Sequence, residues 1–307
     1  MDLERLRGTR VTVVEVGPRD GLQNERASIS TADKIAFIDR LSAARLPVIE
    51  VSAFVSPKWV PQMADAAEVF AGITRAPGVR YTALVPNAAG LDRAVRAGVT
   101  EVAIFAASTE TFSRKNINQS IAESLVTYAA VCKQALSIGL KVRGYLSTAF
   151  GCPYEGRVPA DVVATLTAKL LDLGVFEVAV SDTIGVAHPA QVQQVLEQLL
   201  IRTPARQIAL HLHDTRGTAL ANVLAALPFG IATFDASAGG LGGCPYAPGA
   251  AGNLATEDLI YLLNGLGIET GVSLEGVVNA SAFLAERLDH ALPSRYFQAA
   301  RASTFRL

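Results

Sequence analysis

Charge of either sign is scarce in this chain, and the two signs nearly cancel. Charged residues make up 18% of the 307 residues, with 27 Lys and Arg against 28 Asp and Glu, so the net charge is −1. Nucleic-acid binding depends on a basic surface that displaces counterions from phosphates, and this balance argues against such a partner. An anionic ligand would have to be attracted by a local group of basic residues.

Long apolar runs are also missing. No stretch approaches the roughly eighteen apolar residues of a membrane-spanning helix, so we expect no membrane span. Residues 1–5 include acids where a targeting peptide is basic, and residues 305–307 match the peroxisomal tripeptide poorly. We therefore expect a cytoplasmic protein.

Cysteine is rare and odd in number. Three cysteines in 307 residues provide no disulfide framework and indicate a reducing compartment. Cys132 lies within an amphipathic helical pattern, so we expect it in the core. Cys152 and Cys244 each belong to a copy of Gly-Cys-Pro-Tyr. Because these copies follow different predicted strands, we expect no disulfide between them.

Apolar residues are abundant, at 50% of the chain, which is enough for strands buried on both faces. Eight short apolar runs alternate with amphipathic helical patterns. The expected strands are residues 11–16, 47–51, 81–85, 101–105, 142–146, 176–180, 208–213 and 231–235. The expected helices are residues 31–44, 61–73, 89–97, 120–138, 159–173, 189–202, 217–228 and 256–264, and a further helix at 274–289 has no strand after it.

This alternation predicts an α/β fold, a TIM (β/α)₈ barrel with an additional C-terminal helix. An open doubly wound sheet is the alternative, but no Gly-x-Gly-x-x-Gly follows the first strand. No linker divides the chain, so we expect a single catalytic domain, 1–307. The barrel would span about 11–266. Residues 267–307 would form an elaboration of one helix and a tail, which either covers the site or makes a dimer contact.

Polar residues follow several predicted strands, at the barrel end where TIM barrels place their catalytic residues. His211 and His213 lie two apart on one strand, so their imidazoles point the same way. They are either hydrogen-bonded structural histidines or ligands that hold a divalent ion together with carboxylate and amide oxygens. Asp20 is either a turn residue or a third ligand, and Arg19 beside it can stabilise a developing oxyanion.

Carboxylates interrupt two of the apolar strands and close a third. Glu15 and Glu50 either pair with inner-barrel arginines such as Arg143 or orient residues of the site. Asp182 ends the sixth strand and is either a turn residue or a group that acts in proton transfer.

The glycine-rich stretch 239–253 is the strongest local irregularity. It is either a flexible surface loop or a mobile lid that brings Cys244 to the site. Asn253 at its end is either a helix cap or an amide ligand to the ion. The stretch lacks the Gly-Lys-Ser/Thr of a phosphate-binding P-loop.

A series of motifs together resembles the hydroxymethylglutaryl-CoA lyase family, metal-dependent aldolase-type barrels related to isopropylmalate synthase. The first is Glu-Val-Gly-Pro-Arg-Asp-Gly-Leu-Gln-Asn-Glu at 15–25. The others are residues 54–63, 114–118, 151–156, 181–186, 211–215, 240–246 and 252–258, in order along the chain. The resemblance implies that Asp20, His211, His213 and Asn253 bind a divalent metal, Mg²⁺ or Mn²⁺.

The resemblance also implies roles for other side chains. Arg19 would face the thioester carbonyl, and Cys244 would be the catalytic cysteine of the lid. Asp182 and Glu50 would be acids tied to catalysis, and Asn116 would lie near the CoA arm.

The implied reaction cleaves 3-hydroxy-3-methylglutaryl-CoA into acetoacetate and acetyl-CoA, in leucine degradation and ketone-body formation. Either His211 or Asp182, through water, would take the hydroxyl proton. Residues 145–150 depart from the family pattern, so a lyase for a longer-branched 3-hydroxyglutaryl-CoA is an alternative. A non-catalytic barrel that binds metal or CoA is a third reading. A homodimer is the expected assembly.

Overall fold

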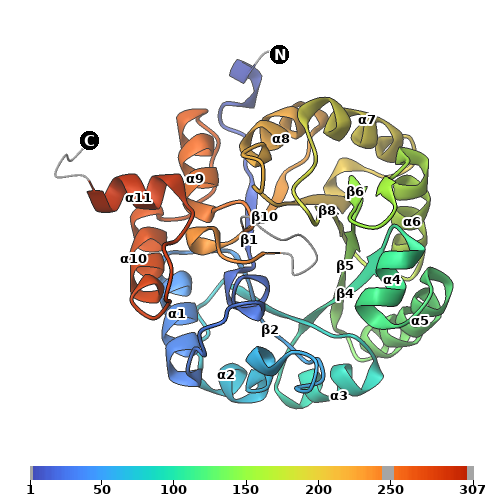
Figure 1. The fold of residues 1–307 in the computed structure, drawn as a ribbon, viewed down its shortest axis with the longest axis horizontal. Helices are drawn as coiled ribbons and strands as arrows, with labels where there is room; N and C mark the ends of the chain where they lie inside the picture. Colours follow the sequence, from blue (N-terminus) through green and yellow to red (C-terminus); the bar gives the residue numbers. More distant parts are fainter. Residues whose placement is uncertain (1–2, 244–251, 303–307) are drawn as a thin grey trace.

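The computed structural model describes residues 3–243 and 252–302, in which eight parallel strands close into a barrel (Figure 1). These strands are β1 (Thr12–Glu15), β2 (Val48–Ala53), β3 (Arg80–Leu84), β4 (Glu101–Ala107), β5 (Lys141–Ser147), β8 (Val178–Asp182), β9 (Ile208–Leu212) and β10 (Thr233–Ala236). Each pairs with the next barrel strand along the chain, and β10 pairs with β1. The predicted TIM barrel and all eight predicted strands are confirmed.

A helix follows each barrel strand. These helices are α1 (Thr31–Ala43), α2 (Ala66–Gly72), α3 (Ala88–Arg96), α5 (Ile121–Ser137), α6 (Ala160–Asp172), α7 (Pro189–Leu200), α8 (Ala219–Ala226) and α9 (Thr256–Gly265). They cover the outside of the barrel (Figure 1), and every residue of β2 is buried. Burial on both faces explains why the strands appear in the sequence as continuous apolar runs.

Local signals set several helix boundaries. The side chain of Ser120 accepts the backbone N–H of Glu123, whose carboxylate accepts the N–H of Ser120, so α5 begins with a capping box. The pattern predicted at 61–73 is divided, because Pro61–Met63 form a 3₁₀ turn before α2. Short 3₁₀ turns of this kind are common where α-helices begin.

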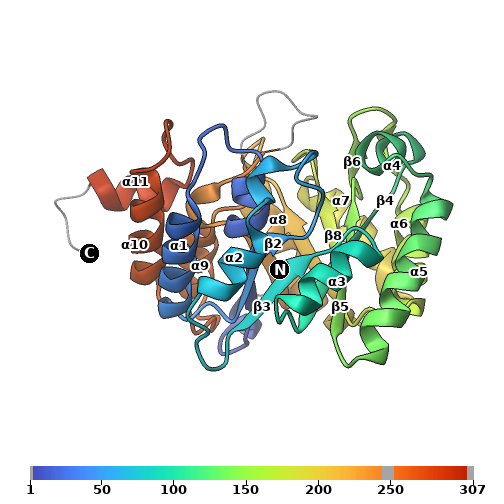
Figure 2. The same cartoon turned by 90° about the horizontal axis from the view of Figure 1, so that it is seen from below.

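Two small elements at the barrel mouth were not predicted. They are α4 (Glu110–Ile117) and a hairpin of β6 (Gly151–Cys152) with β7 (Gly156–Arg157). In Figure 2, α4 and β6 stand at the same end of the barrel. Helix α4 is polar and buries only Phe112 and Ser113, so no apolar periodicity marks it in the sequence.

The C-terminal segment contains two helices in its described part, α10 (Leu274–Ala285) and α11 (Arg295–Ala302), where the sequence predicted one. Helix α10 packs between α1 and α9 and so fills the helix layer there (Figure 1). Helix α11 was missed because it buries only Phe297, and one buried residue gives no apolar period in the sequence. None of the described helices is long and apolar enough to cross a membrane.

Candidate active site

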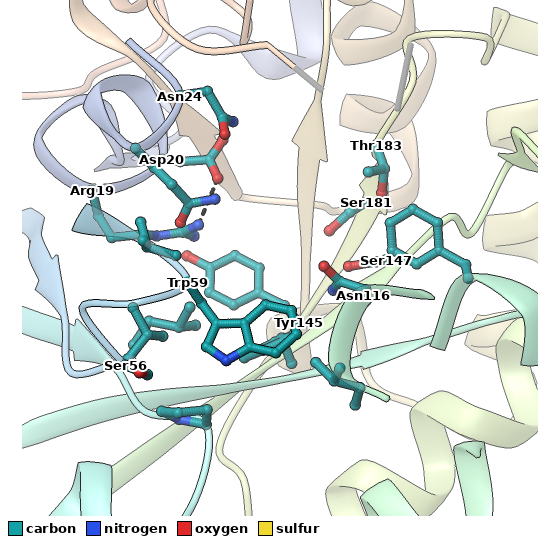
Figure 3. Close-up of a pocket in the computed structure, with 18 of the residues that line it drawn as sticks. Arg19, Asp20, Asn24, Ser56, Trp59, Asn116, Tyr145, Ser147, Ser181 and Thr183 are labelled. Atoms are coloured by element: carbon teal, nitrogen blue, oxygen red, sulfur yellow. Dashed lines mark hydrogen bonds and ion pairs between the residues drawn. The ribbon is translucent and has the colours of Figure 1, made fainter. Parts of the chain in front are cut away.

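A cavity of about 650 Å³ opens at the C-terminal ends of the strands. Five residues predicted for the site line it, namely Arg19, Asp20, Asn116, His211 and His213. Figure 3 shows Arg19 and Asp20 on one side and Asn116, Ser147, Ser181 and Thr183 on the other. Trp59 stands at the rim with 78% of its surface exposed.

Arg19 and Asp20 lie on a π-helical turn, Gly17–Gly21, which begins just after β1. The carbonyl of Val16 accepts the N–H groups of Arg19, Asp20 and Gly21. The turn was not predicted, since five residues are too few to show a helical period. Single π-helical turns occur frequently at functional sites, where they reorient neighbouring side chains.

Glu15 joins this turn to the glycine-rich stretch. Its Oε1 accepts the N–H groups of Gly17 and Ala238, each at 2.8 Å, and its Oε2 accepts the Thr256 hydroxyl at 2.7 Å. Burial raises the pKa of Glu15 to about 7. The suggestion that Glu15 pairs with an arginine such as Arg143 is wrong, because backbone N–H groups and a hydroxyl surround its carboxylate.

Asp20, His211 and His213 bring their ligand atoms within 4.8 Å of one another. Nε2 of His211 lies 3.2 Å from Nε2 of His213 and 3.9 Å from Oδ2 of Asp20. Nδ1 of His211 lies 3.2 Å from Oδ2 of Asp235. Donation from Nδ1 to this carboxylate leaves the Nε2 lone pair free to bind a cation.

The electrostatics of these groups favour a cation. Burial, and then His211, lower the pKa of His213 to about 4, so its imidazole is neutral near pH 7. Burial alone would raise the pKa of Asp20, but the guanidinium of Arg19 outweighs it and holds the pKa below its usual range. The site therefore presents the neutral imidazole of His213 beside a carboxylate anion.

Asn253 contributes a fourth polar group. Its Nδ2 donates to Oδ2 of Asp20 and to the carbonyl of Leu241, each at 2.9 Å. Within the described part of the chain, its buried Oδ1 has no hydrogen-bond partner. A buried oxygen without a donor is costly unless a cation or a water satisfies it. Two imidazole nitrogens, a carboxylate and an amide oxygen form a donor set that fits a divalent cation.

Glu50 pairs with Arg19 and not with Arg143, so the arginine suggested for it was the wrong one. Nε of Arg19 donates to Oε1 of Glu50, and Nη1 donates to Oδ1 of Asp20 at 2.5 Å. Burial alone would lower the pKa of Arg19, but these two carboxylates outweigh it and raise the pKa above its ordinary value. Glu50 thus pairs with an arginine, as its first alternative held, and its role in orienting the site stays a prediction.

Asp182 turns into the loop that follows β8. Its Oδ1 and Oδ2 accept the N–H groups of Val186 and Ala187, each at 2.9 Å. Burial raises its pKa. Its neighbours Ser181 and Thr183 line the cavity. These contacts match the turn-residue alternative, and a role in proton transfer stays a prediction.

Cys244 lies outside the described residues, so its catalytic role also stays a prediction. Gly243 just before it lines the cavity, and its carbonyl accepts Nδ2 of Asn24 at 2.8 Å. A Cβ at Gly252 would lie 2.0 Å from the carbonyl oxygen of Gly240, so no other residue type fits there. The described ends of the glycine-rich stretch therefore adjoin the site.

The two described cysteines are free and buried. Cys132 lies in the core on α5 as predicted, and burial raises the pKa of its thiol to about 11. Cys152 accepts the Thr109 hydroxyl at 3.1 Å.

Sequence reasoning missed the roles of Tyr145, which lines the cavity, and of Asp235, and both side chains are buried. Asp235 accepts from His211, and the Tyr145 hydroxyl donates to Oε2 of Glu50 at 2.6 Å. A signal was present, since Asp235 interrupts an apolar strand just as Glu50 does, on the strand after the two histidines.

Residues 10–284 match the HMGL-like family model. The hydroxymethylglutaryl-CoA lyase of Bacillus subtilis strain 168 is 52% identical over 294 residues, 96% of this chain and 98% of that protein. A crystal structure of the Bacillus subtilis HMG-CoA lyase has a TM-score of 0.95 at 52% identity, with 96% and 99% of the two chains covered.

A third comparison adds a ligand-bound relative. The HMG-CoA lyase from Acinetobacter baumannii, solved in complex with coenzyme A and 3-methylmalate, has a TM-score of 0.92 at 37% identity. The match covers 100% of this chain and 99% of that one. Family model, identity and fold agree over nearly the whole length, and this chain therefore belongs to the hydroxymethylglutaryl-CoA lyase family.

Proposed function

We propose that this protein cleaves the C2–C3 bond of 3-hydroxy-3-methylglutaryl-CoA to form acetoacetate and acetyl-CoA. The observation that carries the proposal is a shared cavity wall, where the guanidinium of Arg19 adjoins Asp20, His211 and His213. The reaction requires a group that binds the substrate hydroxyl and a cation that stabilises the leaving enolate. Relatives that cover nearly the whole chain bear the name of this activity.

Asp20, His211, His213 and Asn253 would hold a divalent cation, which we propose to be Mg²⁺ or Mn²⁺. When bound, such a cation supplies Lewis acidity toward a substrate hydroxyl and carboxylate. Burial keeps the imidazole of His213 neutral, and Asp235 orients the ring of His211.

Arg19 would stabilise the charge that develops on the acetyl-CoA fragment. As the hydroxyl proton leaves, its O–H electron pair becomes the C3=O bond of acetoacetate. The electrons of the C2–C3 bond then form the enolate of acetyl-CoA. A guanidinium fixed by Glu50 and Asp20 is a preorganised partner for the enolate oxygen. The enolate carbon finally takes a proton, which we assign to the thiol of Cys244.

The sequence suggested either His211 or Asp182 as the group that takes the proton from the substrate hydroxyl. Nε2 of His211 faces His213 and Asp20, and both oxygens of Asp182 accept backbone N–H groups. We therefore propose that a water relays the proton from the substrate to one of these groups.

The CoA arm would extend past α4, where Asn116 lines the cavity. Leu84, Phe105 and Tyr145 contribute to the lining from β3, β4 and β5 and are available to pack against the C3 branch of the substrate. An apolar wall distinguishes single methylene groups by only about 1–3 kcal/mol. The chain length of the C3 branch is therefore the property to vary in an assay.

An assay of acetoacetate release from 3-hydroxy-3-methylglutaryl-CoA tests the proposal, with and without a chelator. We expect turnover that EDTA abolishes and that Mg²⁺ or Mn²⁺ restores. No release under any metal condition would refute the activity. A higher kcat/KM for a longer C3 branch would identify the longer-branched substrate instead.

We also propose a cytoplasmic location and a role in leucine degradation and ketone-body formation, the context in which this reaction would operate. A homodimer is the proposed assembly. Light scattering after size-exclusion chromatography would measure the molar mass against the 32.3 kDa of one chain.

A further inference from the structure

A continuous set of hydrogen-bonded side chains joins Arg19 to His211, two residues that line the cavity. Its members lie on the turn after β1 and on strands β2, β5, β9 and β10, and they contact one another in the barrel interior. They are, in order, Arg19, Glu50, Tyr145, Arg143, Asp235 and His211. Each is at most 6% exposed, so bulk water has little access to these bonds. We call this set the buried circuit.

Arg143 lies at the centre of the buried circuit. Its Nη1 and Nη2 donate to the two oxygens of Asp235, at 3.1 and 2.7 Å, in a bidentate pair. Nη1 also donates to the Tyr145 hydroxyl at 3.0 Å, and Nε donates to Glu177 at 2.9 Å. The planar guanidinium thus makes four hydrogen bonds to three neighbours, whereas an ammonium group has only three donors.

One arm of the circuit leads to His211. Asp235 shares its Oδ2 between Nη1 of Arg143 and Nδ1 of His211. Residues 235 and 211 are paired neighbours on β10 and β9. The position of the Asp235 carboxylate therefore sets the direction of the His211 ring and its Nε2.

The other arm leads to Arg19. The Tyr145 hydroxyl accepts from Arg143 and donates its own proton to Oε2 of Glu50. Oε1 of Glu50 accepts Nε of Arg19. Because Tyr145 has one proton to donate, its acceptance from Arg143 directs that proton toward Glu50.

We infer that Arg143 is a positioning residue that couples the Arg19 guanidinium to the cation-binding geometry of His211. If the side chain of Arg19 or His211 shifts, either Arg143 shifts with it or a hydrogen bond of the buried circuit breaks. The two parts of the site, the enolate partner and the cation ligands, are therefore held in register with each other. This inference rests on the proposed function for the role of each end, but not for the coupling itself.

The decisive variant is Tyr145→Phe, which removes one hydroxyl from the arm that leads to Arg19. The phenyl ring keeps its edge contact with His211, where the ring centroids are 5.9 Å apart. We expect kcat to fall at least tenfold with a smaller change in KM. We also expect the Kd for Mn²⁺ without substrate to rise about threefold or more, although this hydroxyl contacts no proposed ligand.

The matched control is Tyr81→Phe. Tyr81 is also a buried strand tyrosine whose hydroxyl is hydrogen-bonded, to Ser42 and to the N–H of Ala76, each at 2.9 Å. Within the described residues, its hydroxyl makes no hydrogen bond to a member of the buried circuit, so kcat and the Mn²⁺ Kd should match those of the wild type. The melting temperature of the Tyr81→Phe protein shows how much stability is lost when a buried tyrosine hydroxyl is removed.

A double-mutant cycle completes the test. It compares Tyr145→Phe, Asp235→Asn and the variant that carries both substitutions. If Arg143 links the arms, the effects of Tyr145→Phe and Asp235→Asn on the Mn²⁺ Kd are non-additive by a factor of about three or more. Strict additivity, or a wild-type Mn²⁺ Kd in Tyr145→Phe, would overturn the inference and leave Arg143 a structural ion pair. Because Mn²⁺ binding is measured without turnover, failure of the proposed activity would leave this test intact.

Discussion

Asn253 donates an amide N–H to Asp20 at 2.9 Å, although the two residues stand 233 positions apart in the chain. This contact joins the end of the glycine-rich stretch to the turn after β1. It also leaves the Asn253 Oδ1 buried and, among the described residues, without a donor. The two elements of the site are thus joined at the place where we propose that a cation binds.

Removal of one imidazole should therefore release the metal. In His213→Ala we expect the bound divalent metal to fall well below one equivalent per chain, because a nitrogen ligand is lost. Metal analysis of dialysed protein measures this. His290→Ala is the control, since His290 pairs with Glu25 at 2.8 Å at the exposed surface. Full metal content in His213→Ala would disprove the ligand set.

Arg19→Gln should impair turnover far more than metal binding. Loss of one preorganised charge partner of an oxyanion typically costs about 10²–10³ in kcat. We expect a loss of at least that size, with bound metal retained, in steady-state kinetics and metal analysis. Arg19→Lys should recover only part of the rate, because an ammonium cannot hold Glu50 and Asp20 together as the guanidinium does. Unchanged turnover in Arg19→Gln would remove Arg19 from the enolate role.

Cys244→Ala should slow proton delivery to the enolate carbon. Proton transfer from a positioned group is worth about 10²–10⁴ in rate, so we expect kcat to fall within that range. Metal content should stay at the wild-type level, because a thiol is not among the proposed ligands. Cys132→Ala serves as the control for thiol loss, since Cys132 lies in the core. A Cys244→Ala protein that lost its metal would contradict the assignment.

Glu15→Gln should change how stability depends on pH. Burial raises the pKa of Glu15 from 4.5 to about 7, so between these values the folded chain holds a proton that the unfolded chain has released. The stability from this proton is full below pH 4.5 and is lost as pH rises through 7. Glutamine is neutral at every pH, and its amide can donate to Thr256 while its oxygen keeps both backbone bonds.

Urea unfolding from pH 5 to 8 measures the effect. The free energy of unfolding of Glu15→Gln, relative to the wild type, should rise with pH by up to about 3 kcal/mol. Glu68→Gln, at an exposed position on α2, should show no such trend. A flat difference for Glu15→Gln would mean that the pKa of Glu15 is not raised.

Several parts of the fold and the site could be predicted from the sequence because they depend on local pattern. Continuous apolar runs indicated the eight strands, since each strand is buried on both faces. The spacing of His211 and His213 indicated one shared direction, because side chains on a strand repeat every two residues. The position of Asp20 after the first strand placed it at the mouth of the predicted barrel.

Partners brought together by barrel closure could not be predicted in this way. The sequence suggested Arg143 for Glu15 and Glu50, whereas Glu15 binds backbone N–H groups and Glu50 binds Arg19. Asp235, the partner of Arg143, was assigned only to a strand. Which inward-facing side chains meet depends on the stagger and tilt of all eight strands together, and no local pattern records it.

The sequence by itself therefore determined the eight barrel strands, the helix after each of them, their order and the residue types that end the strands. Tertiary structure alone decided which of those residues touch. The physical reason is one of range: apolar period and capping act over a few residues, whereas Arg19 and Glu50 are 31 apart and Arg143 and Asp235 are 92 apart. Contacts over such distances form only when closure of the barrel brings their strands into register.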